Sequence, residues 1–147
     1  MTDRLDLFSE LAAADHGLCV VSMLRGDGSI AAAVVNAGVL RHPLTDEDTV
    51  AFVARGLRKL EHLRAHRRLT IVARAGWRWA AVEGDAEIFG PDDPKAGIDP
   101  ESLRLLLRGV FVAAGGSHDD WDTYDRTLEE ERSAAVLVRP SLVYSRA

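Results

Sequence analysis

The segment from residue 54 to residue 59 carries the residue types best suited to chemistry, and that chemistry is anion binding. It reads Ala-Arg-Gly-Leu-Arg-Lys, with cations at Arg55, Arg58 and Lys59, at the point where a strand should end and a helix begin. The first N–H groups of a helix have no partner inside it, and the helix dipole adds partial positive charge there. Cations in that first turn are unfavourable by roughly 0.3–1 kcal/mol each unless an anion binds. The segment predicts a phosphate site, with a solvated basic face as the alternative.

Charge is distributed unevenly around this junction. The chain has a net charge of −5, but the segment 55–68 contains six basic residues and one acid, Glu61, so it carries +5 and the remainder −10. The six bases are Arg55, Arg58, Lys59, Arg64, Arg67 and Arg68. A local cationic segment in an acidic protein suits a small anionic ligand, because the remainder would repel a long polyanion. We therefore expect no nucleic-acid partner.

The sequence gives little support for a metal site, a catalytic nucleophile or a reactive cysteine. His62 and His66 are four residues apart on the basic helix, but the surrounding cations disfavour a bound metal, so we expect no metal site. The sequence contains neither a serine nucleophile elbow nor a phosphate-cradling P-loop, and it identifies no catalytic residue. The single cysteine, Cys19, lies among apolar neighbours and is interpreted as an inert core thiol.

One motif has a misleading form. Residues 26–31, Gly-Asp-Gly-Ser-Ile-Ala, match the dinucleotide-binding pattern G-x-G-x-x-A. That pattern requires a helix to open at the glycines, whereas Val34 and Val35 favour a strand there and Gly38 would weaken a helix. We interpret the glycines as a hairpin turn.

The elements that must position the junction are mostly hairpins separated by helices. We expect helices at 3–15, 56–66, 100–114 and 119–132, and strands at 18–24, 30–40, 49–54, 69–74, 77–89 and 134–138, the last ending at Pro140. The third helix has the clearest start, with a capping Asp99 followed by Pro100. Hairpins without regular βαβ alternation favour a closed or partly closed barrel, an α+β fold that is mainly β with peripheral helices.

Length and hydropathy set the remaining bounds. The 147 residues suffice for one core, so we expect a single domain over 1–147. The sequence has no charge-free apolar run near the roughly 20 residues that span a bilayer. We therefore expect a cytoplasmic protein without a membrane partner.

Three segments taken together resemble a known family. They are 58–64 running into the strand 69–72, 76–88 with its internal Glu83-Gly84, and 118–124 followed by Arg139-Pro140 and Val143-Tyr144. In this order they resemble the pyridoxamine 5'-phosphate oxidase-like split β-barrel family, and within it the deazaflavin (coenzyme F420)-dependent reductases. The resemblance implies an FMN-binding split barrel-like fold and a homodimer that holds the cofactor near its interface.

The resemblance also implies a cofactor and its contacts. The cofactor is coenzyme F420, a two-electron hydride carrier with an anionic tail, and FMN is the alternative. By position Lys59 contacts the phosphate or tail, Arg55 and Arg58 support it, Val53 and Ala54 line the same turn, and Asn36 lies on the strand that faces the ring. The implied function is hydride transfer between the reduced deazaflavin and a small conjugated substrate. An FMN-dependent oxidase or reductase and a non-catalytic cofactor-binding protein remain alternatives.

Overall fold

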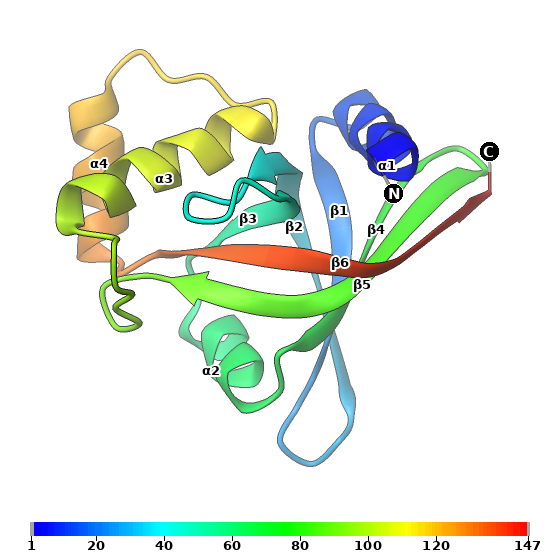
Figure 1. Ribbon diagram of the computed structural model, residues 1–147, viewed down its shortest axis with the longest axis horizontal. Coiled ribbons are helices and arrows are strands. Elements are labelled where there is room, and N and C mark those ends of the chain that lie inside the picture. Colours follow the sequence, from blue (N-terminus) through cyan, green and yellow to red (C-terminus); the bar gives the residue numbers. More distant parts are fainter. Residues whose placement is uncertain (1, 147) are drawn as a thin grey trace.

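The computed structural model describes residues 2–146, which form six strands and four helices (Figure 1). The strands are β1 (Leu18–Leu24), β2 (Ile30–Arg41), β3 (Asp48–Ala54), β4 (Arg68–Ala75), β5 (Arg78–Phe89) and β6 (Ala134–Arg146). The helices are α1 (Thr2–Ala14), α2 (Leu57–Ala65), α3 (Pro100–Ala113) and α4 (Trp121–Glu130). The strands close into an antiparallel barrel in the order β1-β2-β3-β6-β5-β4. The predicted barrel with peripheral helices is confirmed.

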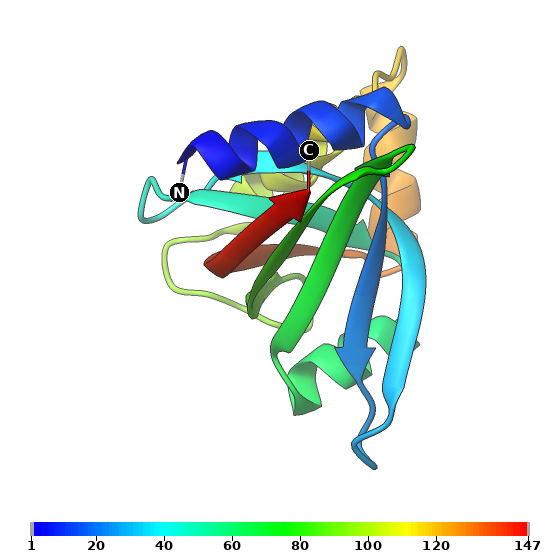
Figure 2. The same cartoon turned by 90° about the vertical axis from the view of Figure 1, so that its right-hand side faces the viewer.

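The barrel interior follows the period-two alternation of its strands. On β1, Cys19, Val21 and Met23 point inward and are buried, while Leu18 and Val20 face outward. Burial raises the pKa of the Cys19 thiol to about 12, with Asp15 adding to the effect, as expected of an inert core cysteine. Helix α1 lies across one end of the barrel and adds Leu5, Phe8 and Leu11 to this core (Figure 2).

A second core lies outside the barrel, beneath α3 and α4. Small residues on the strands, Ala51 and Ala135, allow the helices to approach, and Leu107, Val110 and Leu128 pack against them. The start of α3 is built as predicted, because the Asp99 carboxylate accepts a hydrogen bond from the Ser102 N–H at 2.7 Å. Helices α3 and α4 together cover one side of the barrel (Figure 1).

The turn at residues 26–28 confirms the hairpin interpretation. Gly28 has φ +85°, and the Gly28 N–H donates to the Arg25 carbonyl at 2.9 Å. The following residues are strand β2 and not the helix that a dinucleotide motif requires.

The predicted bounds of β5 and β6 are wrong. Strand β6 does not end at Pro140 but runs through it to Arg146, and its register with β5 shifts between Glu83 and Gly84. Pro140 pairs with Gly84 at this irregularity, where a proline without an N–H is tolerated. Trp77 is not a strand residue but lies in the β4–β5 turn, with 94% of its surface exposed.

Helix α4 begins two residues later than predicted. The Asp120 carboxylate accepts a hydrogen bond from the Thr123 N–H at 3.2 Å, so Asp120 is the capping residue and the helix starts at Trp121. None of the helices in the described residues is both long enough and apolar enough to span a bilayer.

Helix α3 meets β2 at Gly38, and this contact has a testable consequence. A Cβ added there would lie 2.1 Å from the Ala113 carbonyl oxygen, which is backbone and cannot rotate away. Gly38→Ala should therefore lower the free energy of unfolding by about 1–3 kcal/mol, measured by denaturant titration. Gly26→Ala is the matched control, since a Cβ there meets nothing within 4 Å. Equal stabilities of the two variants would contradict the close approach of α3 to the barrel.

Candidate functional site

A cavity of about 340 Å³ lies beside the strand-to-helix junction that the sequence singled out. Its walls come from β2, β3, the start of α2, the end of α3 and α4. The lining residues are Val34, Val35, Asn36, Val53, Arg55, Lys59, Val110, Phe111, Ala114 and Tyr124. Segments distant in the sequence thus meet around the predicted anion site.

The structure brings four of the six predicted contact residues to this cavity. The four are Asn36, Val53, Arg55 and Lys59. Ala54 faces the other way, because the residues of a strand alternate, and its side chain is buried in the barrel core. Arg58 is exposed on α2 and does not line the cavity.

No capping side chain accepts a hydrogen bond from the first N–H groups of α2. Gly56 occupies the N-cap position and offers no side-chain hydrogen bond, and the first turn contains no acidic residue. Lys59 follows as the third residue of the helix and is partly buried. Uncapped N–H groups and a cation in the first turn together favour a bound anion.

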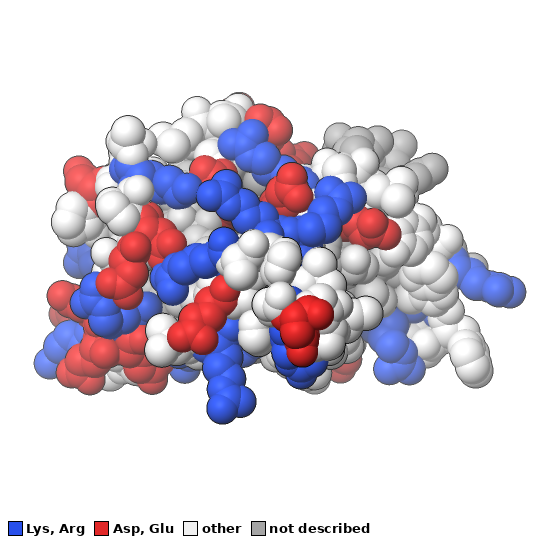
Figure 3. Space-filling view, turned by 90° about the horizontal axis from the view of Figure 1, so that it is seen from below, with Lys and Arg blue, Asp and Glu red and all other residues white. Residues whose placement is uncertain are grey.

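The basic segment divides into paired and unpaired cations. The Arg64 Nε donates to Asp93 at 3.0 Å, and Arg68 lies 3.7 Å from Glu83. Among the side chains that the structure describes, those of residues 5–146, Arg55 and Lys59 form no ion pair. The face seen from below accordingly shows basic side chains with acidic ones between them (Figure 3). Two of the segment's unpaired cations, Arg55 and Lys59, therefore lie at the cavity.

Aromatic rings form the opposite wall, and the sequence analysis did not identify them as site residues. Phe111 and Tyr124 line the cavity, with ring centroids 5.0 Å apart, and Trp121 and His118 pack behind them. In the sequence, the helical spacing of Phe111 and Tyr124 predicted only that they lie on the apolar faces of their helices. It did not indicate that these faces border a cavity. The rings make this wall suitable for a flat, conjugated ligand.

Tyr124 is held as a neutral hydrogen-bond donor. Its hydroxyl donates to the Leu107 carbonyl at 3.2 Å. Burial raises the pKa of Tyr124, and although the nearby Arg55 cation opposes this effect, the net direction is upward. The phenol therefore stays protonated at neutral pH with its proton engaged.

Asn36 is oriented by the adjoining loop. Its Nδ2 donates to the His16 carbonyl at 3.0 Å, which fixes the amide and leaves Oδ1 as an acceptor. Asn36 lies opposite Leu18 in the β1–β2 pair, so the barrel scaffold determines its position.

Comparison with known proteins identifies the fold. No protein-family model and no curated protein sequence matches the chain. Among solved structures, a pyridoxamine 5'-phosphate oxidase-related, FMN binding protein from Nostoc punctiforme is 15% identical, with a TM-score of 0.61 over 98% of this chain and 80% of that one. An F420 reductase is 13% identical, with a TM-score of 0.58 over 86% of this chain and 88% of that one. A heme binding protein from Mycobacterium smegmatis is 13% identical, with a TM-score of 0.59 over 97% of this chain and 57% of that one.

The chain therefore has the fold of the pyridoxamine 5'-phosphate oxidase-like, FMN-binding split barrels, as predicted. At these identities the likeness extends to the fold alone. Proteins with this fold bind different cofactors, according to their names, so the cavity's own residues must carry any argument about function.

Proposed function

We propose that this protein is an oxidoreductase that transfers a hydride between reduced coenzyme F420 and a small conjugated organic substrate. The observation that carries the proposal is the pairing, in one cavity, of two unpaired cations at an uncapped helix start with a wall of aromatic rings. The cations suit an anionic tail, and the rings suit a flat redox-active system. The resemblance of the sequence to the deazaflavin-dependent reductases agrees with this arrangement.

The chemistry of the lining residues fits such a cofactor. Arg55 and Lys59 would hold its anionic part together with the first N–H groups of α2. Beyond the cavity, Arg58 and Arg67 are exposed and have no ion pair in the described part of the chain. This extended charge favours the longer, more anionic tail of coenzyme F420 over the single phosphate of FMN.

The bound cofactor supplies the hydride, and the residues of the chain supply position and shielding. Asn36, held by the His16 carbonyl, would offer its Oδ1 as an acceptor to the cofactor. Phe111 and Tyr124 exclude water from one side. Because the Tyr124 proton is already bonded to the Leu107 carbonyl, Tyr124 would not serve as the proton donor.

Two other functions use the same cavity. An FMN-dependent oxidase or reductase would purify as a yellow protein with flavin absorbance. A non-catalytic binding protein would bind reduced coenzyme F420 without turning over any member of a panel of quinones, enones and tetrapyrroles. Oxidation of the reduced cofactor by one of these substrates, followed by its absorbance, would distinguish the proposed enzyme from both.

We also propose a homodimer formed through the outer face of β1 and β2. This face exposes Leu18, Val20, Ile30 and Val34, which are 38–68% accessible. Val20 and Val34 are paired across the two strands, and Val34 also lines the cavity, so the apolar face continues into the site. A second copy on this face would bury the apolar residues and cover the cavity.

Lys59 provides the test of the cofactor site. Lys59→Ala should weaken binding of coenzyme F420 about ten- to a hundredfold, because a charge-assisted hydrogen bond contributes roughly 1.5–3 kcal/mol. Arg67→Ala is the control, because it removes the same charge from an exposed position outside the cavity. Dissociation constants for coenzyme F420 and FMN would be measured anaerobically at low and high salt.

At high salt the effect of Arg67→Ala should disappear while that of Lys59→Ala persists. The melting temperature of the Lys59→Ala apoprotein should stay level or rise slightly, because a cation is removed from the first helical turn. If both variants weaken binding equally at high salt, the junction is not the anion site. If FMN binds more tightly than coenzyme F420 at both salt concentrations, the choice of cofactor is wrong.

The dimer has its own test by light scattering. The wild-type protein should have the mass of a dimer, and Val20→Glu should have that of a monomer, because it places a charge at the centre of the apolar face. Leu142→Glu is the matched control: Leu142 is 48% exposed on β6, which is not adjacent to β1 or β2 in the barrel. A monomeric wild type, or dissociation by Leu142→Glu alone, would contradict the proposed interface.

A further inference from the structure

A second and larger cavity, of about 610 Å³, lies at the opposite end of the α3–α4 pair. It is bounded by the loop 90–99, the first half of α3 and the end of α4, and it shares no lining residue with the first cavity. Buried apolar side chains form its walls, among them Phe89, Leu107 and Leu128. Its size is that of a small-molecule site, since such pockets measure roughly 300–1,000 Å³.

Two polar atoms at this cavity are buried without a hydrogen-bond partner. They are the Ser133 Oγ and the Arg104 Nε, and both residues belong to the lining. Ser133 is only 2% exposed. Buried polar groups are nearly always paired, because leaving one unpaired costs free energy. A ligand that presents an acceptor oxygen would supply the missing partner.

The charge of Arg104 is already compensated. Its Nη1 lies 3.6 Å from Asp125, and its Nη2 donates to Glu101. Asp125 also accepts from Arg108 at 3.0 Å, which lowers the pKa of Asp125, so this carboxylate stays ionised. The Arg104 Nε is therefore a spare donor in an arginine that needs no further counter-ion.

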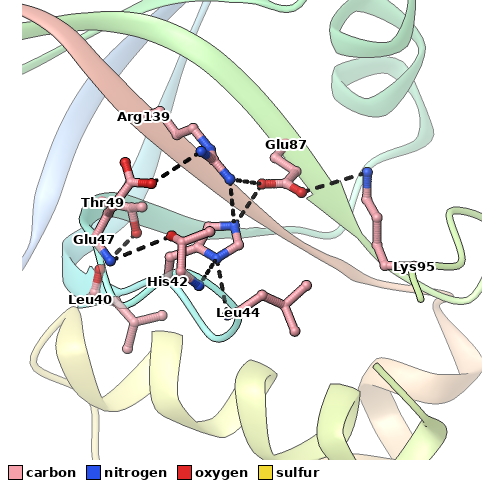
Figure 4. A network of polar contacts seen from close by, with 9 residues as sticks. Leu40, His42, Leu44, Glu47, Thr49, Glu87, Lys95 and Arg139 are labelled. Carbon is pink, nitrogen blue, oxygen red and sulfur yellow. Dashed lines mark hydrogen bonds and ion pairs between the residues drawn. The ribbon is translucent and has the colours of Figure 1, made fainter. Parts of the chain in front are cut away.

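The second cation of the lining, Lys95, belongs to a network of polar contacts with Glu87 and His42 (Figure 4). His42, 3% exposed, accepts hydrogen bonds at Nδ1 from the Leu44 and Thr45 N–H groups, so its proton is on Nε2 and is donated to Glu87 at 2.7 Å. Lys95, which lines the cavity, lies 3.8 Å from the same Glu87 carboxylate and over the Phe89 ring.

Glu87 is ionised despite its partial burial. Burial opposes ionisation, but the hydrogen bond from His42 and the cations Lys95 and Arg139 outweigh it and lower the pKa of Glu87. The charge of Lys95 is thus also compensated within the protein. The lining contains five acidic residues against these two cations, so the cavity disfavours an anion. The acidic residues are Asp93, Asp99, Glu101, Asp125 and Glu129.

We propose that this cavity is a second binding site, for a neutral molecule that combines an apolar ring with a carbonyl acceptor, such as an aromatic carboxamide. The ring lies against Phe89, Leu107 and Leu128, and the carbonyl accepts from Ser133 and from the Arg104 Nε. The proposal does not depend on the cofactor site, because the two cavities have separate walls.

The test uses phenylacetamide and phenylacetate, two probes with the same ring and different charge. Each is titrated into the ¹⁵N-labelled full chain, and amide shifts are followed by NMR. Phenylacetamide should shift the amides of residues 90–104 and 128–133, and phenylacetate should bind more weakly. Ser133→Ala should weaken phenylacetamide binding about 2- to 10-fold while the melting temperature stays level or rises, because an unpaired buried hydroxyl is removed.

Two variants complete the design. Leu103→Trp, at a partly exposed lining position, should fill the cavity and abolish binding without unfolding the protein. Ser145→Ala, at the exposed far end of β6, is the matched serine control and should bind as the wild type does. The proposal is overturned if phenylacetamide does not bind, if phenylacetate binds as tightly, or if Ser133→Ala and Leu103→Trp leave binding unchanged. Shifts confined to Asn36 and residues 55–59 would overturn it as well.

Discussion

The close packing of α3 and α4 on the outside of the barrel is the constraint on which both cavities depend. Gly38 has no side chain, so the α3 backbone can pack directly against β2. Ala51 and Ala135 have short side chains, which allow the helices to pack closely on the strands. With the middle of the helix pair fixed in this way, the two cavities lie at its two ends. One end meets the start of α2 and its unpaired cations, and the other meets the loop 90–99.

The two cavities differ in whether their cationic side chains have acidic partners. Around the larger cavity, both cations have carboxylate partners, and the donors without a hydrogen-bond partner are the Ser133 hydroxyl and the Arg104 Nε. Around the smaller cavity, Arg55 and Lys59 have no acidic partner among the described residues. A net charge of −5 therefore coexists with a locally cationic cavity, because the position of the unpaired groups matters more than their sum.

Local signals allowed much of this to be predicted from the sequence. The junction at residues 54–59 was identified because a strand end, a glycine and first-turn cations are adjacent in the chain. The continuation of β6 through Pro140 was missed because it depends on Gly84, on another strand. Phe111 and Tyr124, and the buried His42 with its partner Glu87 45 residues away, become recognisable only when the fold brings distant segments together.

The central claim is that the junction between β3 and α2 binds the anionic end of a deazaflavin, and its location can be measured directly. Coenzyme F420 would be titrated into the ¹⁵N-labelled protein, and the shifts of all backbone amides compared. The account predicts the largest shifts at residues 55–59, with further shifts at Asn36, Phe111 and Tyr124. Shifts centred on the loop 90–99 and the start of α3, or the absence of saturable binding, would contradict it.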